Sequence, residues 1–247
     1  MEQTLLPGDF LVVNKSAYKL STPSFIPFTN IPLKHFDIWD FDLPKRNDVI
    51  VFDFPGMINE FKPSQQMFFI KRIIGLPGDT VEIINQKVYV DGILLNPPVK
   101  CEFNEKSIKK GEKDFRIFPP DKNWNSDNYG PIIIPKEGDN IFINPKNIKY
   151  WGHIINREFG RKVVSEEGSV ININGKPVIG YTFKKNYYFV LGDKRDESMD
   201  SRYWGFVPED KIIGKAMLVY WSVDPSTVNL DEVFKSTRWS RIFTKIK

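Results

Sequence analysis

The chain has 247 residues, with 35 basic and 31 acidic side chains and a formal net charge of +4. An apolar fraction of 41% and a charged fraction of 27% are ordinary for a folded protein and exclude a disordered or collagen-like chain. So small a positive excess does not indicate nucleic-acid binding, and one cysteine with two histidines excludes an internal disulfide and any metal site built from either residue type. We therefore expect a monomer with no cofactor, no metal ion and no nucleic-acid partner.

Short β-branched and aromatic runs, bounded by Gly, Pro, Asp or Asn, predict a mainly β protein. In chain order, strands are expected at residues 10–13, 49–52, 67–74, 81–84, 87–90, 132–134, 141–143, 170–173, 187–191 and 217–221. Asp91-Gly92 and Asn174-Gly175 predict hairpin turns, because a type I′ turn needs positive φ at both of its positions. Helix is expected only at 147–158 and near the C-terminus.

The density of apolar strands changes along the chain and predicts two domains. Residues 1–85 and 186–225 are dense in such strands, whereas residues 86–185 are more polar. We therefore expect a discontinuous core domain at 1–85 and 186–225, an inserted, mostly β domain at 86–185 and a basic C-terminal tail at 226–247. One continuous sheet with long loops is the alternative.

No stretch of the sequence is apolar enough to cross a bilayer as a helix. Runs of 18 or more apolar residues do not occur, and the start of the chain has neither the basic segment nor the apolar core of a signal peptide. The longest uncharged stretch is 20–33, in which Pro23, Pro27 and Pro32 exclude a helix. Such a segment either folds under the cover of other elements or lies as an apolar rim against a bilayer.

Lys71 stands in the apolar run 67–74 and is the first candidate for chemistry. On a strand it shares a face with Phe69 and Ile73, and apolar neighbours lower the pKa of an amine because they disfavour its charged form. A lysine that is neutral near the working pH can serve as general base towards a hydroxyl nucleophile. The alternative, which this segment alone favours, is an edge-strand lysine that extends to water.

The loop at 193–203 is dense in charged and hydroxyl side chains, although apolar strands flank it on both sides. Charges this close together are unfavourable if left unpaired, so we expect them to pair with one another and to give the loop a fixed shape. A solvated turn is the alternative.

Four segments, in this order, resemble the signature boxes of bacterial type I signal peptidases. They are MEQTLLPGD at 1–9, NDVIVFDFP at 47–55, FIKRIIGLPGD at 69–79 and GDKRDESMDSRYWG at 192–205. The resemblance covers residues 1–85 and 186–222 and implies a signal-peptidase-like β-fold core. It also implies a membrane-anchored serine endopeptidase that removes signal peptides from exported proteins after a small-x-small sequence, using a serine–lysine dyad.

The resemblance assigns roles to individual residues. Lys71 matches the general base, and Ser198 matches a loop serine whose hydroxyl hydrogen-bonds that lysine and orients it. The residues that match supporting positions around this pair are Gly192, Asp193, Asp200 and Arg202. Gly192 lets the backbone pass close to the lysine. The residues that match substrate-binding positions are Met1, Thr4, Leu5, Phe69 and Ile70.

The sequence also departs from the family pattern. The nucleophilic serine of the family immediately precedes the residue that corresponds to Met1, so it is expected just before the first residue of this sequence, together with the oxyanion-hole groups and the membrane anchor. Gln3 replaces a proline, and Lys194 and Glu197 replace two asparagines. Lys194 adds a charge near Lys71 that a partner such as Asp193 or Asp196 can neutralise. Without the serine, we expect no peptidase activity from the chain as written.

Two explanations of the missing serine are open. We favour a start at an internal methionine, or a truncation, because a decayed enzyme has no physical reason to keep Lys71 in an apolar site. The alternative is a non-catalytic homologue that binds extended apolar peptides along a sheet edge. A self-cleaving serine–lysine regulator of related fold is a third hypothesis, although no DNA-binding domain accompanies it.

The C-terminal residues 234–247 contain five basic residues and no acidic one. On a helix, the basic side chains would lie opposite a stripe of Trp239, Ile242, Phe243 and Ile246, which is typical of a membrane-surface helix. A tail that packs on the domain by the same stripe is the alternative. Together with the resemblance, this pattern predicts two partners, the signal peptides of exported preproteins and the membrane lipid surface, at the extracytoplasmic (periplasmic) face of the bacterial inner membrane.

Overall fold

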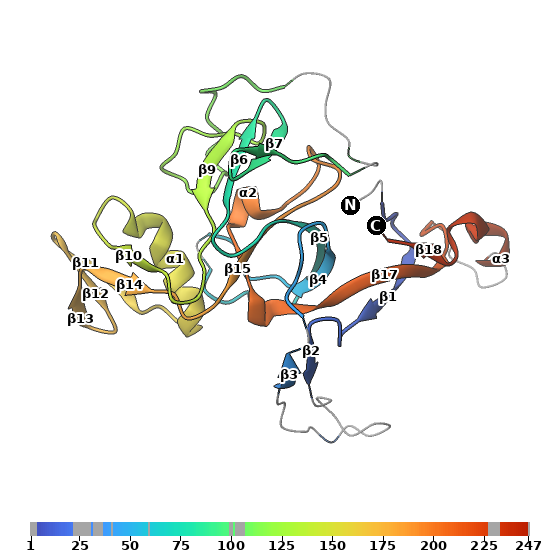
Figure 1. The fold of residues 1–247 in the computed structure, drawn as a ribbon, viewed down its shortest axis with the longest axis horizontal. Coiled ribbons are helices and arrows are strands. Elements are labelled where there is room, and N and C mark those ends of the chain that lie inside the picture. The colour runs from blue at the N-terminus through green and yellow to red at the C-terminus, as the bar shows by residue number, and fades with distance from the viewer. Residues whose placement is uncertain are drawn as a thin grey trace.

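Figure 1 shows the fold as a computed structural model, which describes residues 4–21, 31, 37–40, 42–58, 60–98, 101, 107–226 and 233–246. The strands are β1 (Asp9–Asn14), β2 (Lys19–Ser21), β3 (Asp37–Asp40), β4 (Val49–Asp53), β5 (Phe68–Gly75), β6 (Thr80–Ile84), β7 (Lys87–Val90), β8 (Ile93–Leu94), β9 (Tyr129–Ile133), β10 (Asn140–Phe142), β11 (Val164–Glu167), β12 (Val170–Ile173), β13 (Lys176–Val178), β14 (Gly180–Thr182), β15 (Tyr187–Leu191), β16 (Val207–Pro208), β17 (Ile212–Ser222) and β18 (Thr244–Lys245). The helices are α1 (Ile148–Phe159), α2 (Ser201–Trp204) and α3 (Val233–Ser236), with 3-10 turns at Glu209–Lys211 and Trp239–Arg241. The predicted mainly β architecture is confirmed.

The largest sheet has seven strands in the order β1-β17-β4-β5-β15-β16, with β18 also paired to β17. Its strand pairs are antiparallel. The register of β4 against β5 sets Ile50 opposite Lys71. Because Ile50 and Phe52 are fully buried, β4 anchors the strand that carries Lys71 on the hydrophobic core.

The smaller sheets have the orders β8-β7-β6-β9, β11-β12-β13, β10-β14 and β2-β3. In Figure 1, β6, β7 and β9 lie above the large sheet, β10 to β14 lie at the left end of the molecule, and β2 and β3 lie below. Both predicted hairpin turns are confirmed, because Asp91-Gly92 and Asn174-Gly175 have positive φ at both positions and join paired strands. Asn85-Gln86, which the sequence analysis missed, makes a third such turn between β6 and β7. β6, which belongs to the predicted core domain, therefore pairs with β7 and β9 of the predicted insertion. The limits of the two domains stay a prediction.

The buried apolar side chains of the large sheet and of the predicted insertion form one contiguous cluster. Near the proposed site, its centre is Trp204, which is fully buried and whose ring lies 5.8 Å from both Phe52 and Phe54. Fully burying aromatic side chains stabilises a fold by about 1.5–3 kcal/mol each, so this cluster holds α2 firmly against β4.

Near the C-terminus the predicted helix is present only as the short α3, and residues 234–246 do not form the continuous helix that their pattern favoured. Residues 233–246 form the four-residue α3, a 3-10 turn and β18, which pairs with β17 through Leu218–Lys245 and Val219–Thr244. Unsatisfied strand-edge groups of β17 bind this segment, and that pairing replaces the helical hydrogen bonds. The predicted apolar rim at 20–33 lies almost wholly outside the described residues, as do Met1 and Gln3.

Candidate active site

Lys71 and Ser198 come together although 127 positions separate them in the chain. Lys71 lies in the middle of β5, and Ser198 lies in the loop between β15 and α2. The Lys71 Nζ donates a hydrogen bond of 2.7 Å to the Ser198 Oγ, and Ser198 is buried. The structure therefore brings the two residues that the resemblance pairs into direct contact.

The surroundings of Lys71 favour its neutral form. Burial lowers the pKa of Lys71 below its ordinary value of 10.5, and the nearby Arg202 guanidinium acts in the same direction. The carboxylates of Asp200 and Asp193 oppose this change without reversing it. On the same face of β5, the Phe69 ring centroid lies 6.0 Å from the Lys71 Nζ. An amine in this position can accept a proton at a lower pH than a solvated lysine.

Gly192 leaves the space in which the pair meets. A Cβ atom at this position would lie 2.0 Å from the Ser198 Oγ, 2.5 Å from the Ser198 Cβ and 3.5 Å from the Lys71 Nζ. No side chain fits there without moving Ser198. The close approach that the resemblance implied for Gly192 is therefore a packing requirement at the site.

Asp200 and Arg202 form a buried ion pair that supports the loop. The Arg202 Nε and Nη2 donate to the two carboxylate oxygens of Asp200, each at 2.9 Å, and Asp200 also accepts from the Gly192 N–H at 3.1 Å. Arg202 further donates to the carbonyl oxygens of Ser126 and Arg195. Because both charges are fully paired, the loop can bury them and still hold Ser198 in one place.

Asp193 has a partner that the sequence analysis did not assign. The Nε and Nη2 of Arg72 donate to its two carboxylate oxygens at 2.9 and 2.8 Å, and the Thr4 hydroxyl donates to it as well. Burial alone would raise the pKa of Asp193, but these hydrogen bonds hold it below its usual value. Side chains alternate between the two faces of a strand, so Arg72 lies on the face opposite Lys71. This alternation is the sequence signal that could have revealed the pair, because a buried arginine needs an anionic partner.

The two substitutions in the loop neutralise each other. Lys194 and Glu197 form an ion pair of 2.5 Å on the exposed side of the loop, while Asp193 is held by Arg72. Of the two partners expected for Lys194, Asp193 is therefore bound elsewhere, and Glu197 provides a carboxylate that the sequence analysis did not name as a partner. Lys194 and Glu197, the two residues that depart from the resemblance, form an oppositely charged pair, so their charges offset each other locally.

The described residues that match substrate-binding positions have different environments. Phe69 is half-buried and stacks on Phe54 with ring centroids 4.6 Å apart, and Ile70 is half-buried beside it in β5. Leu5 is buried and the Thr4 hydroxyl is held by Asp193. Met1, the fifth of these residues, falls outside the described part of the chain.

Arg157 of α1 joins the predicted insertion to the site region and was not anticipated. Its guanidinium donates to four carbonyl oxygens, those of Gly56, Met57, Glu60 and Trp204. Burial lowers its pKa to about 10, since no carboxylate hydrogen bond compensates for the loss of water. A single side chain thus fixes both the β4–β5 connection and the end of α2.

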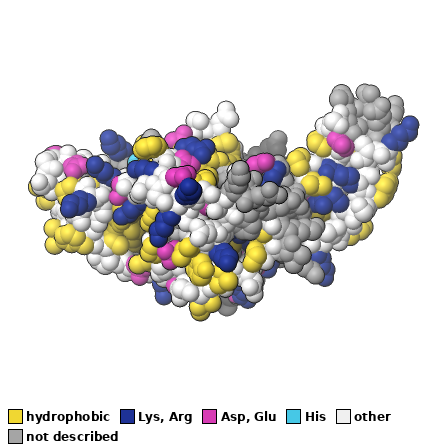
Figure 2. All heavy atoms as spheres, turned by 90° about the horizontal axis from the view of Figure 1, so that it is seen from above, with side chains coloured by type: hydrophobic (Ala, Val, Ile, Leu, Met, Phe, Trp, Pro, Cys, Tyr) yellow, Lys and Arg dark blue, Asp and Glu magenta, His cyan; other side chains and the backbone are white. Residues whose placement is uncertain are grey.

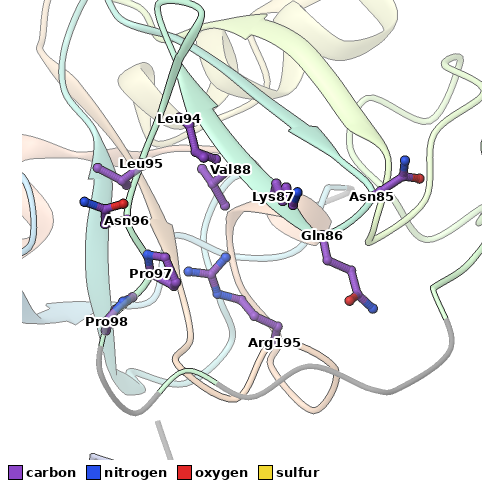
Figure 3. A pocket seen from close by; sticks show the side chains of 10 residues that line it. All are labelled: Asn85, Gln86, Lys87, Val88, Leu94, Leu95, Asn96, Pro97, Pro98 and Arg195. Atoms are coloured by element: carbon purple, nitrogen blue, oxygen red, sulfur yellow. The ribbon is translucent and has the colours of Figure 1, made fainter.

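A cavity of about 340 Å³ is lined by residues 85–88, residues 94–98 and Arg195. Figure 3 shows the side chains that line it. The Arg195 Nε donates to the Gly192 carbonyl oxygen at 3.1 Å, so its side chain connects the wall of the cavity to the loop. Neither Lys71 nor Ser198 lines this cavity, which therefore lies apart from the proposed chemistry. Nowhere in the described ranges do three His, Cys, Asp or Glu side chains converge on a possible metal position.

The fold and the lysine–serine contact are those expected of a serine–lysine peptidase, and comparison with known proteins identifies the family. The sequence model of one family, described as "Signal peptidase, peptidase S26", matches residues 1–221. The chain therefore belongs to the signal peptidase family S26, a family of serine peptidases.

The relatives within this family are signal peptidases I. The chain is 31% identical to Signal peptidase I of Aquifex aeolicus over 90% of this chain and 72% of that protein. It is 29% identical to Signal peptidase I of Buchnera aphidicola subsp. Schizaphis graminum over 91% of this chain and 66% of that protein. The chain thus spans about two thirds of the length of the curated relatives that it matches.

One solved structure is also similar, a crystal structure of a signal peptidase I from Enterococcus faecalis V583. The similarity covers 70% of this chain and 97% of that chain, at 22% identity and a TM-score of 0.31. A TM-score that low adds nothing to the family assignment, which depends on the sequence comparisons.

Proposed function

We propose that this chain forms the peptidase body of a signal peptidase I, in which Lys71 is the general base for a serine located immediately before Met1. The observation that supports this proposal most directly is the 2.7 Å contact between the Lys71 Nζ and the Ser198 Oγ at a partly buried position. A solvated lysine would be protonated and could not accept a proton from a serine.

The proposed reaction is acyl transfer in two stages. Lys71 Nζ takes the proton of the serine hydroxyl as the serine oxygen attacks the scissile carbonyl, and Lys71 then gives that proton to the leaving amine when the peptide bond breaks. A water molecule, deprotonated by the same amine, then attacks the acyl carbon. The bond from that carbon to the serine oxygen breaks, the serine oxygen takes the proton back from Lys71, and the signal peptide leaves with a free carboxylate. Ser198 orients the amine throughout, and the Asp200–Arg202 pair holds Ser198 in its loop.

The pairing of β5 supports an extended peptide as substrate. β4 pairs with residues Phe68 to Arg72, whereas β15 pairs only with Arg72, Ile73 and Gly75. Within the described residues, the first half of β5 therefore has a strand on one side only, directly beside Lys71. An extended peptide can add there as a further strand, with Phe69 and Ile70 next to its side chains.

We also propose that the protein works at the extracytoplasmic surface of a membrane. Of the helices in the described part of the chain, none has the length and apolarity needed to span a bilayer. The C-terminal segment exposes three aromatic side chains, Phe234, Trp239 and Phe243. Figure 2 shows basic and hydrophobic side chains close together at the end of the molecule that α3 occupies in Figure 1. Aromatic side chains beside basic ones suit a lipid headgroup surface.

Lys71→Ala tests the assignment of the base in a protein that carries a serine immediately before Met1. The expected result is a loss of cleavage of a signal-peptide substrate by a factor of about 10² to 10⁴ or more, because the proton acceptor is gone. Ser198→Ala should cause a smaller loss, since it removes only an orienting hydrogen bond.

Activity should rise with pH along an acid limb that lies below 10.5, because burial lowers the pKa of Lys71.

The matched control is Lys176→Ala, which removes an exposed lysine of β13 and should leave cleavage unchanged. Substantial cleavage by Lys71→Ala would mean that the base is assigned to the wrong residue. Binding of a small-x-small peptide without turnover, measured by fluorescence anisotropy in the serine-bearing protein, would instead favour a non-catalytic peptide receptor.

A further inference from the structure

The C-terminal segment of the chain lies against its N-terminal segment. Residues beyond 221 fall outside the family match, yet Val223 donates its N–H to the Gly8 carbonyl oxygen at 3.0 Å, and Arg238 donates its N–H to the Ser222 carbonyl oxygen at 2.8 Å. The segment 222–241 therefore reaches the turn that precedes β1. This contact is long-range in sequence and is not part of the proposed dyad.

Arg241 is the centre of this contact. Its Nε donates to the Asp9 Oδ1 at 3.0 Å, and its Nη2 donates both to the Asp9 Oδ2 and to the Thr4 carbonyl oxygen. The side chain of Asp9 is buried and that of Arg241 is 15% exposed. Asp9 also accepts from the Ser222 hydroxyl at 2.6 Å and from the Leu6 N–H at 2.8 Å. One guanidinium thus holds both ends of the segment 4–9.

The contact around Gly8 leaves no room for a side chain at that position. The guanidinium of Arg238 donates to the carbonyl oxygens of Pro7 and Val223. Gly8 has a φ of +85°, and a Cβ atom there would lie 2.0 Å from the Val223 carbonyl oxygen. Only glycine combines that conformation with that contact. The segment 4–9 is therefore seated in a close-fitting cradle made by residues 222–223 and 238–241.

Thr4 connects the cradle to the proposed active site. Its carbonyl oxygen accepts from Arg241, while its hydroxyl donates to Asp193. Asp193 is bound to Arg72, the residue after Lys71, and follows Gly192, which abuts Ser198. Hydrogen bonds therefore lead from the C-terminal segment, through Thr4 and Asp193, to β5, the strand that carries Lys71. Asp193 also belongs to the loop that carries Ser198.

We propose that Arg241 is a positioning residue for the proposed cleavage reaction: it fixes Thr4 and Asp9 so that the serine expected before Met1 is presented to Lys71. The inference depends on the proposed function, because the serine is part of that proposal. The physical reason is geometric. A nucleophile only about 1 Å out of place can react about 10²-fold more slowly. Thr4 is the described residue nearest to that serine in sequence.

The test compares Arg241→Gln and Arg241→Lys with the parent protein, and uses Arg161→Gln as a matched control. Arg161 is an exposed arginine whose guanidinium donates to the Asn174 side chain. In the chain as it stands, hydrogen exchange read by mass spectrometry should be faster in residues 4–9 of Arg241→Gln by about tenfold or more. Exchange in β4 and β5 should be unchanged, which shows that the fold is intact.

In the serine-bearing protein, Arg241→Gln should lower kcat by about 10- to 100-fold and change KM by a smaller factor. The reason is that β5, along which the peptide is proposed to bind, is not touched, although Thr4 and Leu5 lie in the segment that Arg241 holds. Arg241→Lys should recover part of kcat, since it keeps the charge but not both hydrogen bonds to Asp9. Arg161→Gln should match the parent in both experiments.

Three outcomes would overturn the proposal, and they are distinguishable. If the serine-bearing parent cleaves and Arg241→Gln has the same kcat, Arg241 has no positioning role, and the proposed function is not affected. Unchanged exchange in residues 4–9 shows that Arg241 does not hold the segment. A serine-bearing parent that does not cleave removes the proposed function itself, and the positioning role with it.

Discussion

Two pairs of an aspartate and an arginine, each two residues apart, have the same local geometry and opposite surroundings. In the loop that follows β15, the Nε and Nη2 of Arg202 donate to the carboxylate oxygens of Asp200 at 2.9 Å each. In the predicted insertion, the same atoms of Arg116 donate to those of Asp114 at 3.0 and 2.7 Å. The side chains of the first pair are 2% and 0% exposed, whereas Arg116 is 75% exposed.

The difference between the pairs arises from their tertiary neighbours. Asp200 accepts from the Gly192 N–H, and Arg202 donates to the Ser126 and Arg195 carbonyl oxygens. Arg116 lies over the ring of Tyr203 and otherwise faces water. Sequence spacing therefore determines the shape of the ion pair. Burial determines whether the loss of one partner leaves an uncompensated charge.

Replacing Arg202 should produce the largest effect. Arg202→Ala leaves the carboxylate of Asp200 buried without its cation, so the free energy of unfolding should fall by about 3–5 kcal/mol. Arg116→Ala removes the same type of bond from an exposed pair and should change it by less than about 1 kcal/mol. Urea denaturation of both variants, followed by tryptophan fluorescence, measures the difference.

Equal losses from these two substitutions would contradict the comparison. If Arg202→Ala does not fold, Arg202→Lys provides the test, because it keeps the charge but cannot make the two-pronged contact with Asp200. That variant should still be less stable than Arg116→Lys.

Gly192→Ala should have the next largest effect. The added methyl group would overlap Ser198, so Ser198 has to move away from Lys71, and overpacking of this kind lowers stability by about 1–3 kcal/mol. Cleavage by the serine-bearing protein should fall with it. Gly152→Ala in α1 is the matched control, because its Cβ would meet only ordinary contacts, the nearest at 3.5 Å. If the two variants unfold at the same urea concentration, the close approach at Gly192 is not a constraint.

The smallest expected effect concerns the stability that acid removes. This loss should depend on salt differently for the two pairs. Burial raises the pKa of Asp200, but Arg202 holds it below its usual 3.8, and the hydrogen bond from Arg116 lowers the pKa of Asp114 likewise. Because both folded-state values are depressed, each pair contributes stability above pH 3.8 that is lost as the pH falls through the folded-state value.

Salt at about 1 M screens exposed charges far more than buried ones. The loss of stability caused by Asp114→Asn should therefore be smaller in about 1 M NaCl. In the parent, the part of the acid-induced loss of stability that comes from the Asp200–Arg202 pair should persist at that salt concentration. Urea denaturation from about pH 5 downward, at low and high salt, checks both statements. A parent whose acid-induced loss disappears in salt would show that the Asp200–Arg202 pair behaves as an exposed one.

Much of the large sheet could be predicted from the sequence, because its strands are long, apolar and bounded by turn residues. The predicted strand at 187–191 agrees with β15 at both ends, and the predicted helix at 147–158 agrees with α1 within one residue at each end. Several strands of two to four residues, such as β8 and β13, were missed, since so few residues rarely establish a period of two, although β7, β10 and β12 were predicted. The first half of β17 was missed because Gly214, Lys215 and Ala216 interrupt its apolar pattern.

The candidate site was predictable only where a motif carries it. The contact between Lys71 and Ser198 follows from two boxes with recognisable order, but nothing in the local sequence pairs Arg72 with Asp193 or Lys194 with Glu197. The prediction of a continuous C-terminal helix did not hold for a different reason. Its aromatic and basic pattern fits a helix, whereas the pairing of β18 with β17 satisfies the same backbone groups in another way.

The adjacency of the two ends of the chain has a consequence for the order in which the protein folds during synthesis. Among the described residues, β1 pairs with β17, and Asp9 binds Arg241, which is 232 positions later. During synthesis, residues 4–9 leave the ribosome long before Arg241 and cannot take their final place until it has emerged. A nascent chain that stops short of residue 241 can fold the sheet around Lys71, but it still lacks the side chain that holds Thr4.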